Sequence, residues 1–83
     1  MHIKVLFFAT LRDKAGTRML ELDIQPATTV QQLKALVAGR LPATAEMLEH
    51  CLAAVNHEYS EEQASIPPDA EVAFFPPVSG GHM

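Results

Sequence analysis

The sequence contains few of the residues from which reactive sites are usually built. Its single cysteine, Cys51, excludes an internal disulfide and fits a reducing compartment. No Cys-x-x-Cys pair occurs and the four histidines lack the spacing of metal ligands, so we expect no metal site. A glycine-rich loop that could cradle phosphate is also missing. These absences argue against chemistry in an internal pocket.

Basic residues and long apolar runs are scarce as well. Six Lys and Arg are scattered among ten Asp and Glu, giving a net charge of −4, so we expect no nucleic-acid binding. The same charge predicts that a partner attracted by electrostatics is basic. No apolar run approaches the ~20 residues that span a bilayer, and the N-terminus lacks the regions of a signal peptide. We therefore expect a cytoplasmic protein without membrane contact.

The length of 83 residues suits one domain with a single modest core. An apolar fraction of 48% with 19% charged residues is typical of a folded protein. We assign residues 1–76 to this domain and residues 77–81 to a flexible C-terminal tail. Residues 82–83 are interpreted as a cloning remnant or a junction.

Two strands are predicted in the first part of the chain. Residues 2–9 and 18–24 alternate with the period of two that places successive side chains on opposite faces. The polar stretch 10–17 between them predicts a turn, so the two strands should form a hairpin. Both faces of the first strand carry apolar residues, which predicts an interior place in the sheet.

The stretch that follows has helical periodicity. Thr28 or Thr29 can cap the first turn, Gly39 is placed to end the helix, and Pro42 bars its continuation. Residues 43–50 have weaker helical character. The core-facing stripe is predicted to contain Val30, Leu33, Leu36, Val37 and Leu41, and the opposite side Gln31, Gln32, Lys34 and Arg40.

The second half of the chain returns to strands. Residues 52–56 predict a third strand, Tyr59 begins a short return, and residues 72–75 form the final strand. Ile66 is an isolated apolar residue that is expected to fill the core from a loop. This element order predicts an α+β protein with the β-grasp fold, a mixed sheet covered on one face by one main helix.

Candidates for catalysis inside the domain are weak. His50 and Cys51 are adjacent, but neighbours along a strand point to opposite faces, so we interpret Cys51 as a buried, inert thiol. Glu58, Glu61 and Glu62 are interpreted as solvated surface.

The C-terminal stretch carries the strongest signal. Pro76 and Pro77 end the last strand, because Pro76 has no N–H to donate and Pro77 restricts Pro76 to extended geometry. From Pro76 to Gly81 the chain can reach about 20 Å. Its tip, Gly80 and Gly81, has no Cβ and can pass a channel too narrow for other residues. The pattern predicts an arm that is delivered into a partner.

Residues 71–81 resemble the C-terminus of the MoaD-like sulfur carriers, the small subunits of molybdopterin synthase. Residues 3–9 and 52–56 match the same family in the same order, so the resemblance spans nearly the whole chain. The resemblance implies a ubiquitin-like fold. Family members end at the second glycine, whereas this chain continues through His82 and Met83.

The resemblance also implies a mechanism. A MoeB-like, ATP-dependent adenylating enzyme would form an acyl-adenylate on the carboxylate of Gly81, and sulfur would then replace AMP. The thiocarboxylate would donate sulfur to cyclic pyranopterin monophosphate inside the large synthase subunit, with which a heterotetramer is expected. The chain itself would bind no cofactor and would be a carrier subunit, with the catalytic groups on its partners.

A docking surface is predicted beside the tail. Phe74 and Phe75 point to opposite faces of the last strand, so one belongs in the core and the other on the open face near Tyr59. The alternative is that the chain's own loops cover the second ring. The predicted partner-binding residues are Phe75, Phe74, Tyr59, Pro76, Pro77, Val78 and Ser79, and the predicted reactive residues are Gly81 and Gly80.

Several alternatives remain open at this point. His82 and Met83 would block activation of Gly81, and they are explained by a cloning site, by later trimming or by a junction to a removed domain. A thiazole-pathway sulfur carrier, or a protein modifier that forms isopeptide bonds, would share the fold and the Gly-Gly tip. A plain ubiquitin-like interaction module would not need the tip.

Overall fold

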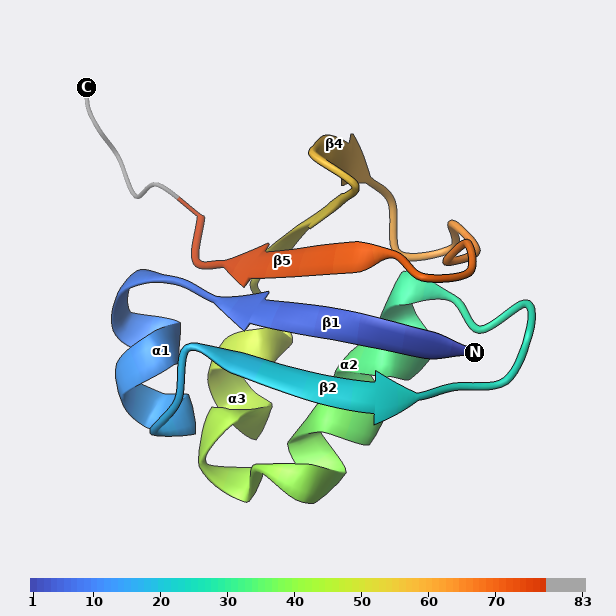
Figure 1. Cartoon of the computed structure of the whole chain (residues 1–83). Coiled ribbons are helices and arrows are strands. Elements are labelled where there is room, and N and C mark those ends of the chain that lie inside the picture. Colours follow the sequence, from blue (N-terminus) through green and yellow to red (C-terminus); the bar gives the residue numbers. More distant parts are fainter. Residues whose placement is uncertain (78–83) are drawn as a thin grey trace.

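The computed structural model describes residues 1–77. Within them, five strands form one mixed sheet in the order β2-β1-β5-β3-β4, and α2 crosses one of its faces (Figure 1). The central strand β5 runs parallel to β1 and antiparallel to β3. This arrangement confirms the predicted α+β class. The elements are β1 (His2–Phe7), α1 (Ala9–Ala15), β2 (Met19–Asp23), α2 (Val30–Arg40), a 3₁₀ helix (Pro42–Thr44), α3 (Ala45–Leu48), β3 (Leu52–Val55), β4 (Glu58–Ser60) and β5 (Glu71–Phe75).

The connection between β1 and β2 differs from the predicted polar turn. The two strands do pair antiparallel, but residues 9–15 between them form α1. Leu11 is fully buried under this helix, and Gly16 ends it in left-handed geometry with φ 74°. Seven residues with one buried side chain give no helical repeat, so periodicity could not detect α1. Its packing against the domain stabilises it.

Helix α2 begins as expected and ends later than expected. The Thr29 hydroxyl accepts a hydrogen bond from the Gln32 N–H at 3.2 Å, and the Gln32 side chain accepts one from the Thr29 N–H at 2.9 Å. The predicted end at Gly39 is wrong, because the helix continues to Arg40 and the Leu41 N–H still donates to the Val37 carbonyl. Pro42, which cannot donate such a bond, follows directly.

The buried side of α2 is rotated relative to the prediction. Leu36 was assigned to the core but is 48% exposed, and Lys34 was assigned to the polar side but is only 7% exposed. The two residues border the stripe of Val30, Leu33 and Val37 on opposite sides. The helix turns toward Lys34 because the lysine stem can be buried while its ammonium group finds acceptors at the rim.

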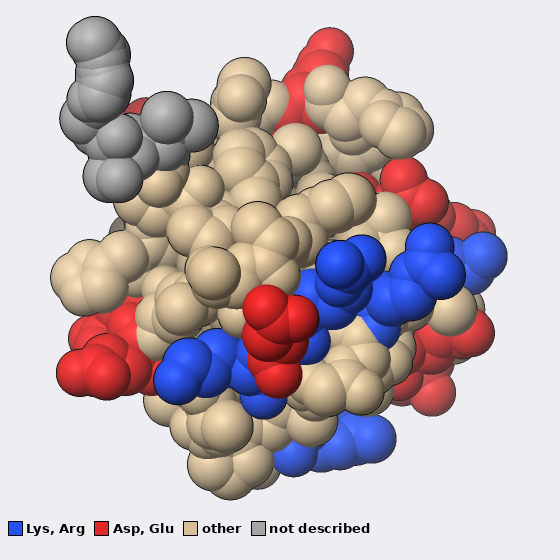
Figure 2. All heavy atoms as spheres, turned by 90° about the vertical axis from the view of Figure 1, so that its left-hand side faces the viewer, with Lys and Arg blue, Asp and Glu red and all other residues tan. Residues whose placement is uncertain are grey.

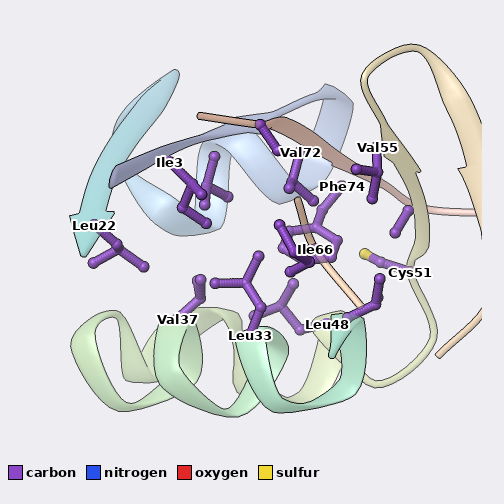
Figure 3. Close-up of a cluster of buried hydrophobic side chains, with 14 of the residues drawn as sticks. Ile3, Leu22, Leu33, Val37, Leu48, Cys51, Val55, Ile66, Val72 and Phe74 are labelled. Atoms are coloured by element: carbon purple, nitrogen blue, oxygen red, sulfur yellow. The ribbon is translucent and has the colours of Figure 1, made fainter. Parts of the chain in front are cut away.

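The core lies between α2 and the sheet (Figure 3). Ile3, Val72 and Phe74 point into it from the strands, and Leu33 faces them from the helix. Ile66 is 2% exposed and lies among them although it belongs to no strand or helix, which confirms that it fills the core from a loop. The opposite face of the sheet carries no helix in residues 1–77 and is therefore the surface on which a site can form.

Candidate functional site

The outer face of the sheet, opposite α2, is built by strand alternation. In β5, Val72 and Phe74 are buried, whereas Ala73 and Phe75 are only partly buried. Phe74 was predicted to bind a partner, but its ring is completely buried in the core and so cannot form part of a surface. Phe75 is the ring of the pair that reaches the outer face.

One line of residues across the outer face is entirely apolar, and we call it the apolar row. Its members follow from the pairing register, in which Leu6 lies opposite both Met19 and Ala73, and Ala54 lies opposite both Ala73 and Tyr59. The row therefore crosses all five strands that the structure describes in residues 1–77. In sheet order it consists of Met19, Leu6, Ala73, Ala54 and Tyr59.

The aromatic part of the face lies at the end of β5 from which the tail leaves. The rings of Tyr59 and Phe75 are 5.8 Å apart in an edge-to-face arrangement. Leu52 lies opposite Phe75 and is exposed, and Phe8 is exposed just after the end of β1. Tyr59 remains 78% exposed despite its contact with Phe75. Loops within residues 1–77 therefore do not cover this face.

The other end of the outer face is charged. Lys4 lies opposite Glu21 on one side and opposite Glu71 on the other. His2 contacts Glu21 at 2.6 Å, and His57 lies 3.6 Å from Glu71. The face thus changes from polar to apolar along the strands, and its apolar half adjoins the exit of the tail. A partner that covers this half also meets the chain where the tail begins.

The exit itself is formed by Pro76 and Pro77. Pro76 is half-buried after the last residue of β5, and Pro77 is exposed. The remaining predicted tail residues, Val78, Ser79, Gly80 and Gly81, lie outside the described residues, as do His82 and Met83. Their assigned roles and the division of the chain at residue 76 remain predictions.

A buried polar cluster lies elsewhere, between α2 and the segment after β4. The Lys34 ammonium donates to the Cys51 carbonyl at 2.7 Å and to Glu62 Oε2 at 2.6 Å. Glu62, predicted to be free surface, is therefore held in an ion pair. Burial raises the pKa of the Cys51 thiol, although the nearby Lys34 charge partly opposes this. The thiol is protonated at neutral pH and is a poor nucleophile.

The other candidates for chemistry in residues 1–77 give no site. His50 is exposed, whereas Cys51 is buried, so the adjacent pair does not form a reactive couple. Within these residues no three His, Cys, Asp or Glu side chains lie together as metal ligands do. No helix in this range is long and apolar enough to cross a membrane. The outer face and the tail exit are therefore the candidate site.

Sequence analysis missed part of this site. It did not assign Met19, Leu52, Ala54 or Ala73 to a docking surface. The available signal was the alternation of each strand, but only the register shows that outward residues from separate strands meet in one row.

The fold and site together define a ubiquitin-like β-grasp protein with an apolar outer face beside its C-terminal tail. A family model described as the ThiS family matches residues 5–81, and the chain belongs to this family. The molybdopterin synthase sulfur carrier subunit of Escherichia coli is 41% identical over 95% of this chain and 99% of its own length. That of Chlamydomonas reinhardtii is 32% identical over 98% of this chain and its whole length. These relatives confirm the resemblance to MoaD-like carriers.

Solved structures agree with the fold. The small archaeal modifier protein 1 of Haloferax volcanii has a TM-score of 0.85 and 26% identity, and the match covers 93% of this chain and 98% of that one. A second match is one chain of a complex between subunits 1 and 2 of molybdopterin-converting factor from Helicobacter pylori. Its TM-score is 0.70. That match covers 98% of this chain and all of the other, and its 20% identity supports the fold alone.

Proposed function

We propose that this chain is the sulfur carrier of molybdopterin synthesis and acts through the carboxylate of Gly81. The observation that carries the proposal is the position of the tail exit, directly beside the apolar half of the outer face. Membership of the ThiS family and the names of the two relatives above support the same function.

The reaction begins with activation of the tail. A MoeB-like adenylating enzyme uses ATP to join AMP to the Gly81 carboxylate, and pyrophosphate leaves. A sulfur donor then displaces AMP and leaves a thiocarboxylate on Gly81. Adenylation is needed because a carboxylate oxygen is a poor leaving group, whereas AMP is a good one. Two terminal glycines allow the carboxylate to enter a narrow site.

The second reaction transfers the sulfur. The carrier places its thiocarboxylate in the large subunit of molybdopterin synthase, where it donates sulfur to cyclic pyranopterin monophosphate. A structure of two molybdopterin-converting-factor subunits in complex, one of which has this fold, supports a large subunit as partner. We propose a heterotetramer of two carriers and two large subunits. The inert environment of Cys51 is consistent with catalytic groups supplied by the partners.

In this proposal the outer face holds the carrier while the tail reacts. Apolar side chains such as Phe75, Tyr59 and Leu52 lose contact with water when the partner covers them, which favours binding. Pro76 and Pro77 then end the pairing of β5, because neither can donate a hydrogen bond that would continue β5 beside another strand.

The test of the reaction compares two chain lengths. A chain ending at Gly81, incubated with the adenylating enzyme, ATP and a sulfur source, should gain the mass difference between sulfur and oxygen. A chain ending at Met83 should remain unchanged, because an amide bond occupies the Gly81 carbonyl carbon. Gly81→Ala in the shorter chain should lower the yield. Equal sulfur uptake by both lengths, with residues 82–83 retained, would refute the proposal.

The test of docking uses the two adjacent rings. Phe75→Lys should weaken binding of the large subunit while the melting temperature changes little, because Phe75 lies on the outer face. Phe74→Lys should unfold the protein, because it places a charge in the core. Leu36→Lys, on the exposed side of α2, is the control and should leave both binding and stability unchanged. Unchanged binding of Phe75→Lys would exclude the outer face as the docking surface.

A second candidate is a protein modifier that forms isopeptide bonds. It is favoured by the match in fold to the small archaeal modifier protein 1. Both functions require an adenylated Gly81, but only a modifier becomes attached to lysine side chains. Mass spectrometry of proteins from cells that express the Gly81-ended chain distinguishes them, because a modifier leaves its C-terminal peptide on target lysines. The 41% identity to a molybdopterin synthase sulfur carrier subunit favours the carrier function.

A further inference from the structure

Basic side chains gather at the end of the molecule from which the tail leaves. Figure 2 shows a band of Lys and Arg side chains across this end, with an acidic side chain among them. Three of the six basic residues of the chain, Arg12, Lys14 and Arg18, lie between β1 and β2 in and after α1. All three are exposed. We call them the basic end.

The basic end has few acidic neighbours, although Glu46 lines the same hollow as Lys14. Asp13 is the only one of the ten acidic residues that lies between β1 and β2. Within residues 1–77, none of the three basic side chains forms an ion pair. Arg12 and Lys14 are in the last turn of α1, where the helix dipole favours positive charge. That effect does not account for Arg18, which lies beyond Gly16 and outside the helix.

The position of the basic end relative to Pro77, at the tail exit, is fixed. Lys14 and Pro77 line the same hollow of about 370 Å³, together with Glu46 and His50. The Phe7 N–H donates to the Arg18 carbonyl at 3.0 Å, and the Phe8 N–H donates to the Phe74 carbonyl at 3.3 Å. These bonds hold Arg18 against β1 and Phe8 against β5, the strand that leads to the tail exit. The charges therefore approach a partner together with the tail.

The charge at this end is opposite to that of the whole chain. A net charge of −4 predicts a basic partner, but the surface beside the tail exit presents positive charge to any site that the tail enters. An adenylation site also holds ATP, which is an anion, and the carrier must bring a carboxylate to it. Local positive charge would turn the carrier so that its tail end approaches first.

We propose that Arg12, Lys14 and Arg18 dock on an acidic protein surface that borders the tail-receiving site of the adenylating enzyme. This inference rests on the proposed function and adds an orientation to the docking on the outer face. An acidic protein fits better than nucleic acid, because three basic side chains, two on the seven-residue helix α1 and one after it, give few phosphate contacts.

The experiment measures association of the carrier with the ATP-loaded adenylating enzyme by stopped-flow mixing. The carrier ends at Gly81, and the test variant combines Arg12→Gln, Lys14→Gln and Arg18→Gln. We expect about a tenfold slower association at about 0.1 M salt, where the Debye length is ~10 Å. At about 1 M salt, where it is ~3 Å, the two rates should converge. The melting temperature should change little, because all three side chains are exposed.

A matched control changes the net charge equally at positions outside the basic end. It combines Gln25→Glu, Ala35→Glu and Arg40→Gln, three exposed positions in and before α2. This variant should associate nearly as fast as the unmodified chain. Equal slowing of both variants would attribute the effect to net charge and overturn the inference.

Two further outcomes would also overturn it. Association of the test variant at the unmodified rate at every salt concentration would leave the basic end without a role in docking. Loss of binding to a single-stranded RNA oligomer, with enzyme association unchanged, would assign the basic end to nucleic acid. The proposed function fails separately, if the unmodified chain ending at Gly81 is not adenylated at all.

Discussion

Replacement of Lys34 tests whether its buried ammonium group stabilises the domain. Lys34→Met keeps most of the apolar stem and removes the charge. In the folded protein this charge is bound by the Cys51 carbonyl and by Glu62 Oε2, at 2.7 and 2.6 Å. These two bonds attach α2 to the start of β3 and to the segment after β4. The substitution therefore loosens contacts between three parts of the chain.

The expected loss of stability follows from the surroundings of each acceptor. The Cys51 carbonyl belongs to a buried residue, and loss of its partner costs about 1–3 kcal/mol. The Glu62 side chain is 49% exposed, so water replaces much of the ion pair and its loss costs below about 1 kcal/mol. Relief from burying the ammonium group offsets part of both losses. We expect Lys34→Met to lower the free energy of unfolding by about 2 kcal/mol.

Urea unfolding followed by circular dichroism measures this difference. At the same time the melting temperature should fall by roughly 10 °C, given about 4–8 °C per kcal/mol for a domain of this size. Lys14→Met, an exposed lysine in α1, is the control and should change stability by less than about 0.5 kcal/mol. If Lys34→Met is as stable as the unmodified chain, burial of the ammonium group costs as much as its two hydrogen bonds contribute, and our reasoning is wrong.

Three further predictions concern the helices and the thiol. Val37→Ala should cost about 2 kcal/mol because Val37 is fully buried, whereas Leu36→Ala should cost below about 1 kcal/mol; equal losses in urea would contradict the rotated helix. Gly16→Ala should cost about 1 kcal/mol, because the backbone of Gly16 is left-handed, at φ 74°. Gly39, by contrast, is in regular helix, so Gly39→Ala should raise stability by about 0.5–1 kcal/mol. Thermal melts that reverse this order would refute the prediction. Burial raises the pKa of the Cys51 thiol above its ordinary value of 9.0, so the unfolded state loses this proton first as pH rises. The resulting stabilisation is fully present below about pH 9 and is lost as the pH rises through the higher pKa of the folded state. Cys51→Ala should therefore reduce the loss of stability above about pH 9, and an unchanged pH profile would exclude the effect.

The sequence alone determined most of the fold. Strand alternation divided the residues of β1 and β2 between two faces, because successive side chains of a strand point to opposite sides. Thr29 and Gln32 set the start of α2 through contacts only three residues apart. Pro76 and Pro77 fixed the exit of the tail, since a residue without an N–H ends strand pairing wherever it occurs. Each of these features depends on near neighbours in the chain.

Tertiary structure decided the features that depend on distant residues. Lys34 is buried because Cys51 and Glu62 provide acceptors, 17 and 28 residues away, and no local pattern contains that information. Helix α1 is stabilised by packing of Leu11 on the domain rather than by its own periodicity. The apolar row exists only after five strands adopt one register, since alternation gives the face of each residue but not its neighbour on the next strand. The basic end lies beside the tail exit because parallel pairing brings the ends of β1 and β5 together.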